Sequence, residues 1–208
     1  ILEQYLKDKG ISASDIFVNY TPFGHSDWSK IVSDVVALGA DGKKVGVIST
    51  INGDANIGFY KELAAANISA DKIPVVAFSV GEEELSGLDT SNLVGHLAAW
   101  NYFQSAESDI NSEFIRAWKA RMGNKRVTND PMEAHYIGFN MWVNAVKQAG
   151  TTNVDAVRTA MYGQKFPNLT GGTAEMLTNH HLSKPVLIGE IKADGQFDII
   201  SQTEPVPG

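Results

Sequence analysis

Cysteine is absent from the sequence, which excludes a disulfide framework, a thiolate nucleophile and a cysteine-based metal site. Positive charge is also scarce, because 17 Lys and Arg residues face 24 Asp and Glu residues and leave a net charge of -7. A surface of that sign repels a phosphate backbone, so no nucleic acid is expected as a partner. No apolar run reaches the length of about 18 residues that a membrane-spanning helix needs.

The residues that are present suit a globular protein with a packed core. Hydrophobic residues make up 43% of the 208 positions and charged residues 20%, which is ordinary for such proteins. The length suffices for one or two domains. Residues 1–10 have the pattern of the back half of a helix that ends at Gly10. A domain rarely opens in the middle of a helix, so the sequence is expected to be a piece of a longer chain.

The strongest pattern lies between residues 45 and 84. Two apolar runs, 45–50 and 73–78, are typical of strands buried on both faces, and residues 59–66 between them have helical spacing. This order predicts a parallel β-α-β unit whose two loops meet at one edge of the sheet. Ligands of open α/β sheets bind at that edge. The polar residues of the two loops are therefore the predicted binding residues: Asn52, Gly53, Asp54, Ser79 and Glu82.

The remaining segments extend this pattern into an α/β fold with a parallel sheet flanked by helices. Residues 15–20 are predicted to form a strand, followed by a helix with Ser26 as its N-cap and an end near Gly39. The apolar segment 94–103 is predicted to be a strand that leaves the first layers. Further predictions are helices at 108–122, 131–148 and 154–161, weakly patterned turns at 163–182, and a hairpin turn at 194–195.

Candidate chemistry is limited to a few short motifs. Residues 82–84 are three glutamates, typical of a solvated first helical turn, although contact with a ligand and acid–base catalysis both stay open for them. His180 and His181 are adjacent, and neighbours on an extended segment point apart, which disfavours a metal site. Ser79 lacks the Gly-x-Ser-x-Gly frame of a nucleophile. No catalytic residue, metal ligand or cofactor is predicted, and the pattern favours the binding of a small polar solute.

Five segments taken together carry a family resemblance: YTPFGHSDW at 20–28, STINGDAN at 49–56, FSVGEEE at 78–84, GHLAAWNYFQ at 95–104 and NDPMEAH at 129–135. They resemble the urea-type substrate-binding proteins of bacterial ABC transporters, which are close relatives of the short-chain-amide-binding proteins. The resemblance covers essentially the whole chain. It implies the type I periplasmic-binding-protein fold, in which two α/β lobes enclose the ligand in a cleft.

The resemblance also implies a division of the chain, with one lobe nearly complete and part of the other. Residues 1–94 would form most of the second lobe, and residues 95–104 would cross between the lobes. Residues 105–182 would supply the helical part of the first lobe, and the hairpin at 183–208 would return to the second. The missing first-lobe segment would come from upstream residues, a second polypeptide or another copy of the chain.

The function implied is that of the extracytoplasmic solute-binding component of an ABC importer, periplasmic or lipid-anchored outside the cell. It would bind urea or a short-chain amide and deliver it to a membrane permease. Urea offers N–H donors and one carbonyl acceptor, which carboxylate, amide and hydroxyl groups can match. Two alternatives stay open: a cytoplasmic amide-sensing regulator of the same fold, and an amidohydrolase-like enzyme that uses Glu82.

Overall fold

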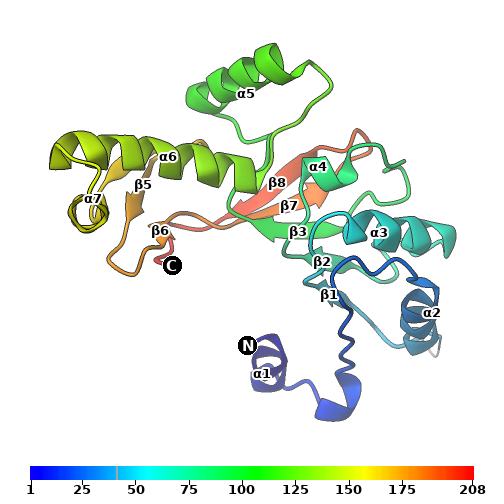
Figure 1. The fold of residues 1–208 in the computed structure, drawn as a ribbon. Helices are drawn as coiled ribbons and strands as arrows, with labels where there is room; N and C mark the ends of the chain where they lie inside the picture. The colour runs from blue at the N-terminus through cyan, green and yellow to red at the C-terminus, as the bar shows by residue number, and fades with distance from the viewer. Residues whose placement is uncertain (41) are drawn as a thin grey trace.

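A five-stranded sheet organises the chain (Figure 1), of which the computed structural model describes residues 1–40 and 42–208. The strands lie in the order β1, β2, β3, β7, β8. β1 to β3 are parallel, whereas β7 and β8 are antiparallel to their neighbours, so the predicted α/β class holds with a mixed sheet. The strands span Val47–Ser49 (β1), Val75–Ala77 (β2), Leu97–Trp100 (β3), Leu187–Ile191 (β7) and Phe197–Gln202 (β8).

The parallel β-α-β unit predicted between residues 45 and 78 is confirmed. Helix α3 (Ala55–Ala65) connects β1 to β2, and the two strands pair in parallel register. Phe59 and Leu63, one turn apart on α3, are buried in the core that the sheet shares with this helix. Burial of such a side chain contributes about 1.5–3 kcal/mol. This face therefore fixes α3 on the sheet, and the loops after β1 and β2 leave the sheet at the same edge.

Helix α2 (Ser29–Leu38) begins later than predicted, and the N-cap expected at Ser26 is wrong. Asp27 supplies the side-chain acceptor instead, because its Oδ1 accepts hydrogen bonds from the Ser29 backbone N–H at 3.2 Å and the Ser29 hydroxyl at 2.5 Å. Trp28 then stands at the helix start, buried with its ring edge toward Phe59. The helix ends at Gly39, as predicted.

The strand predicted at residues 15–20 is also wrong. After α1 (Leu2–Asp8) and the short 3-10 helix η1 (Ala13–Asp15), this segment runs extended without strand pairing. Phe17 is 63% exposed and Tyr20 90%. An extended segment becomes a strand only beside a neighbour that offers hydrogen-bonding groups, and none of the described strands pairs with this one.

The strand predicted within residues 94–103 is confirmed as β3, but the expectation that it leaves the first layers is wrong, because residues 97–100 form the middle strand of the sheet. β3 pairs with β2 on one side and with β7 on the other. The small side chains of Ala98 and Ala99 suit this crowded central position. The chain leaves the sheet only after Trp100.

Beyond β3 the chain folds back over the sheet through an aromatic contact. The rings of Phe103 and Phe197 stack with centroids 4.3 Å apart. Gly189 of β7 lies beneath them, and a Cβ at that position would be 2.8 Å from the Phe103 ring. The glycine is therefore needed for this close approach.

Three further helices agree with the predictions to within one residue at each end: α5 (Asp109–Met122), α6 (Asp130–Ala149) and α7 (Val154–Met161). The side chains of Ser108 and Asn129 cap α5 and α6 by accepting hydrogen bonds from the backbone N–H groups of Asn111 and Met132. Gly150 ends α6 in the left-handed conformation, with φ of 64°.

Residues 163–182, predicted as weakly patterned turns, contain a small antiparallel sheet instead. Its strands are too short for an alternating pattern to stand out in the sequence. Ile137 and Met141 of α6 pack against Ala174 and form a second apolar core with this sheet. The strands are β4 (Lys165–Pro167), β5 (Thr173–Met176) and β6 (Leu182–Ser183).

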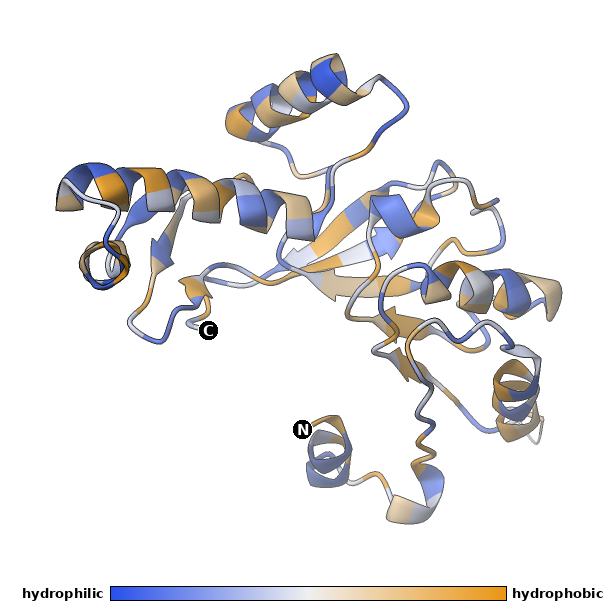
Figure 2. Ribbon diagram, viewed as in Figure 1, coloured by the Kyte–Doolittle hydropathy of each residue, from blue (hydrophilic) through white to orange (hydrophobic). Residues whose placement is uncertain are grey.

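One face of α6 leaves apolar side chains in contact with solvent. Phe139 and Trp142 are 56% and 44% exposed, and their rings stack at 6.1 Å. Figure 2 shows further apolar residues along α5. Among the described residues, the core around the central sheet includes none from α5 or α6, so these helices do not fold back onto that sheet. In the described part of the chain, no helix combines the length and apolar character needed to cross a bilayer.

A buried polar junction joins the sheet to the helical part. Lys184, just before β7, forms an ion pair with Glu133 of α6, and both side chains are almost fully buried. Asp130, one turn earlier on α6, accepts a hydrogen bond from the Asn101 backbone N–H at 2.9 Å. The Asn101 side chain donates in turn to the Pro185 carbonyl at 2.8 Å. The start of α6 is thus held to both segments that connect it with the sheet.

Lys184→Met should lower the free energy of unfolding by about 3–5 kcal/mol, because it leaves the Glu133 carboxylate buried without its cation. The double variant Lys184→Met, Glu133→Leu should lose less, since it also removes the stranded charge. Chemical denaturation of the wild type and both variants measures these differences. Equal losses in the single and double variants would contradict the prediction.

Candidate functional site

Two loops meet at the carboxyl edge of β1 and β2, and the side chain of Asn56 holds them together. Asn56 is fully buried, and its Nδ2 donates to the carbonyl groups of Ile51 at 2.9 Å, Gly53 at 3.2 Å and Ser79 at 3.2 Å. The first two carbonyls belong to the loop after β1, and the third belongs to the loop after β2. One amide group therefore sets the separation of the two loops.

The loop after β1 presents Asn52, Gly53 and Asp54 to solvent. Gly53 has a φ of 61°, in the left-handed region that glycine adopts without the strain that a side chain brings. This turn places Asp54 at the N-terminus of α3. Acidic residues are common at such positions, where the first N–H groups of a helix lack partners within the helix.

The loop after β2 packs between the end of β3 and the start of α6. Ser79 is half-buried, whereas Gly81 is buried so close to Trp100 that a Cβ on it would lie 3.2 Å from the indole ring. The same Cβ position is 3.6 Å from Asn129, the cap of α6. The predicted edge therefore lies beside the junction between the sheet and the helical part.

Residues 82–84 start the short helix α4 (Glu82–Leu85), which agrees with the helix start predicted for them. Successive helical residues point about 100° apart, so the three carboxyl groups face different surroundings. Glu82 turns inward: it is 1% exposed, and its Oε1 accepts a hydrogen bond from the Gln104 backbone N–H at 2.7 Å. Burial raises the pKa of Glu82 to about 8, because the charged carboxylate loses its water. Glu82 therefore contacts the segment after β3 and not the exposed edge.

Glu84 is half-buried and bonds back to the start of its own helix. Its Oε2 accepts a hydrogen bond from the Gly81 backbone N–H at 2.9 Å and closes a capping box. Burial raises the pKa of Glu84, the Gly81 N–H opposes that rise, and the negative charges of Glu83 and Asp54 add to it. Burial is the largest of these contributions and the charge of Asp54 the smallest.

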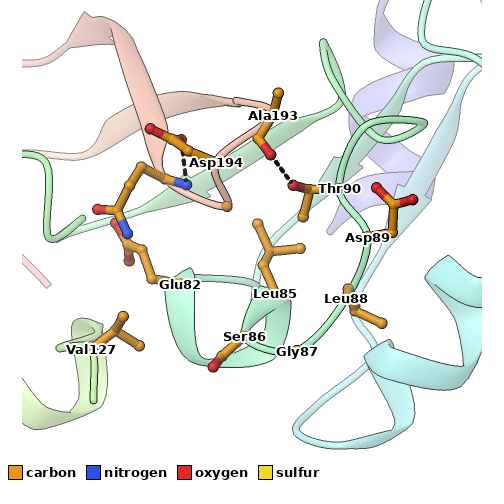
Figure 3. A pocket seen from close by; sticks show the side chains of 12 residues that line it. Glu82, Leu85, Ser86, Gly87, Leu88, Asp89, Thr90, Val127, Ala193 and Asp194 are labelled. Atoms are coloured by element: carbon orange, nitrogen blue, oxygen red, sulfur yellow. Dashed lines mark hydrogen bonds between the residues drawn. The ribbon is translucent and has the colours of Figure 1, made fainter. Parts of the chain in front are cut away.

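A cavity of about 310 Å³ lies behind the edge, beside Glu82 (Figure 3). Its walls are α4, the loop 86–90, Val127 and the turn 193–196 between β7 and β8. The Thr90 hydroxyl closes one side by donating to the Ala193 carbonyl at 2.7 Å. Asn52, Gly53, Asp54 and Ser79 do not line this cavity, so the five predicted residues do not surround one described cavity.

The histidines occupy structural positions. The His96 ring is fully buried, and its Nδ1 accepts a hydrogen bond from the Val75 backbone N–H at 3.1 Å. Burial lowers the pKa of His96, which keeps the ring neutral as an acceptor. His180 lies 3.1 Å from the Tyr162 hydroxyl. Within residues 1–40 and 42–208, no group of three or more His, Asp or Glu side chains is arranged to hold a metal ion.

The structure brings four of the five predicted residues to one edge and places the fifth, Glu82, behind it. Sequence reasoning missed Asn56 and Glu84. Asn56 lies at the start of a helix, where asparagine commonly caps, and no local pattern shows that its side chain reaches a second loop. Glu84 could not be separated from its two neighbours, because a run of three identical residues has no preferred face.

Comparison with known proteins gives a family match over the whole chain and a match to a single relative over part of it. The family described as periplasmic binding protein domain matches residues 1–208. A limonene hydroxylase from Geobacillus stearothermophilus is 34% identical over 114 residues, which are 54% of this chain and 21% of that protein.

Solved structures of solute-binding proteins share the architecture. One from Rhodopseudomonas palustris, in complex with p-hydroxybenzoic acid, has a TM-score of 0.84 at 17% identity and covers 99% of this chain and 56% of its own. An amino acid ABC transporter substrate-binding protein from Pseudomonas fluorescens has a TM-score of 0.75 at 18% identity, covering 99% and 55%. The chain thus spans about half the length of these structures.

These matches agree with the topology described above. The mixed sheet with flanking helices is the type I periplasmic-binding-protein fold, as the sequence resemblance implied. The family match extends from the first described residue to the last, so it does not depend on one motif. The chain therefore belongs to the periplasmic binding protein domain family.

Proposed function

We propose that the full-length protein is the solute-binding component of an ABC importer. Its place is outside the cytoplasm, in the periplasm or held by a lipid anchor, and its partner is the membrane permease of that importer. Family membership and the fold shared with solute-binding proteins support this role. The loops at the carboxyl edge of β1 and β2 supply one wall of the ligand site, in accord with the general position of ligands on open α/β sheets.

In this proposal the chain supplies most of one lobe and part of the other. Residues 1–94 and the hairpin at 183–208 belong to the second lobe, and residues 105–182 belong to the first. The crossing between them was expected at residues 95–104; because residues 97–100 form β3, the proposal places it after this strand. The exposed pair Phe139 and Trp142 on α6 supports this division, because a soluble monomer rarely leaves a large apolar face open. The rest of the first lobe covers that face and provides the second wall of the cleft.

The proposed ligand is a small neutral solute with several N–H donors, such as urea or a short-chain amide. The observation that carries this choice is the exposed loop after β1, in which Asn52 and Asp54 offer amide and carboxylate acceptors at the start of α3. Arg126 reaches the glutamates, but its guanidinium pairs with Glu83 at 3.1 Å. A solute that brings N–H donors satisfies these acceptors directly.

Ligands of other chemistry fit this edge less well. The Rhodopseudomonas protein was solved with p-hydroxybenzoic acid. A carboxylate of that kind, placed here, would meet the like charge of the exposed Asp54. The name of the Geobacillus relative refers to limonene, which is a hydrocarbon. It would take the Asp54 carboxylate out of water without offering it a partner.

The full-length protein should bind urea, acetamide or formamide at least about tenfold more tightly than p-hydroxybenzoate or leucine, because like charge disfavours the carboxylate ligands. Isothermal titration calorimetry against this panel measures the order of affinities. An ammonia assay on the same samples separates binding from hydrolysis. Preference for p-hydroxybenzoate or leucine would refute the ligand class while leaving the family unaffected.

Asp54→Ala in the full-length protein should weaken binding of the preferred ligand by roughly tenfold to a hundredfold, because a hydrogen bond to a charged group is worth about 1.5–3 kcal/mol. Asp71→Ala is the matched control, since Asp71 is equally exposed but precedes β2 at the opposite edge of the sheet. Calorimetry gives the affinities, and thermal unfolding checks that both variants fold. An unchanged affinity for Asp54→Ala would remove this residue from the site.

A further inference from the structure

The segment that follows β3 is bonded to both parts of the molecule, and Gln104 is at its centre. On the sheet side, Glu82 accepts the Gln104 backbone N–H at 2.7 Å, and the Gln104 side chain donates to Gln196 at 3.1 Å. On the helical side, the Thr128 backbone N–H donates to Gln104 Oε1 at 2.9 Å, and the Asn111 side chain donates to the Gln104 carbonyl at 3.0 Å. Gln104 thus connects α4 and the β7–β8 turn with α5 and the segment before α6.

Glu82 is the member of this group that belongs to the loop of the proposed site. It lies three residues after Ser79, whose carbonyl Asn56 holds. Its Oε1 bonds to Gln104, and its Oε2 is buried without a hydrogen-bond partner among the described residues. A buried carboxyl with an unused oxygen costs free energy that a leucine of similar size would not. The contribution of this carboxyl is therefore its bond to the segment after β3.

We propose that Glu82 is a positioning residue that couples the loop 79–84 to residues 101–106, which we name the crossing segment. The proposal rests on the proposed function, because it concerns how a shift at the proposed ligand-binding edge is transmitted to the helical part. A shift of the loop moves the Glu82 carboxyl, and the Gln104 N–H follows, since a hydrogen bond in surroundings of low dielectric is strong. The other bonds of Gln104 carry the shift to the helical part.

The test reads the distance between the two parts of the full-length protein without any ligand. Lys61→Cys on α3 and Lys147→Cys on α6 can carry spin labels at two exposed positions. These 208 residues contain no other cysteine to compete for the label, and any cysteine elsewhere in the full-length protein is replaced by serine. The labelled wild type should give one narrow distance distribution. Glu82→Leu should broaden it, because nothing then accepts the Gln104 N–H. Glu82→Gln should restore the narrow distribution, because its amide oxygen still accepts that bond.

Glu107→Leu is the control, since Glu107 is an exposed glutamate just after the crossing segment, and this variant should keep the narrow distribution. A purely structural role for Glu82 would lower the thermal midpoint of Glu82→Leu and leave the distribution narrow. That result would overturn the proposal. The distances are measured without ligand, so their outcome does not depend on the calorimetric tests of Asp54 and of the ligand class.

If Glu82→Leu does not fold, hydrogen exchange in the wild type tests whether the bond between Glu82 and Gln104 holds the crossing segment. The Gln104 amide should then exchange as slowly as that of Ala98 in the middle of β3, because a buried carboxyl protects it. Exchange of the Gln104 amide at the rate of the exposed Glu107 amide would show that the bond to Glu82 does not hold the crossing segment.

Discussion

The side-chain amide of Asn56 determines the geometry of the edge on which the proposed function depends. Parallel pairing of β1 and β2 brings two loops to the same edge, but pairing alone leaves their separation free. Asn56 removes that freedom by bonding to carbonyl groups of both loops from a fully buried position. Loss of a partner for such a buried group costs about 1–3 kcal/mol, so the two loops and the start of α3 behave as one rigid unit.

The connection between this unit and the helical part is mostly polar. Besides the Lys184–Glu133 ion pair, the Tyr102 hydroxyl lies within hydrogen-bond distance of Asn111 at 2.7 Å and of Thr128 at 2.8 Å. Hydrogen bonds depend steeply on angle, so a polar junction favours discrete orientations. An apolar junction would allow gradual sliding instead. The molecule therefore combines an edge held by one buried amide with a polar junction between the sheet and the helical part.

The sequence predicted those elements whose pattern of apolar and turn residues is visible within a few neighbouring positions. The apolar runs 45–50 and 73–78 became parallel strands, and the Asp-Gly turn at 194–195 became a hairpin. The segment 15–20 failed because strand pairing depends on a neighbour that a local pattern does not show. The position of the two loops at one edge was predicted, but the contacts of their side chains were not, and binding at this edge stays a prediction. Asn56 acts across a separation of 23 residues in the sequence, and only the turn of α4 decides that Glu82, of the three glutamates, is the one buried against Gln104.

The contact between Phe103 and Gly189 has a mechanical consequence. The missing side chain of Gly189 makes a socket in β7, and the Phe103 ring sits in it, stacked on Phe197. Lifting the ring out of this socket would expose apolar surface to water. The contact therefore anchors the segment after β3 on β7 and β8 without a covalent bond or a hydrogen bond.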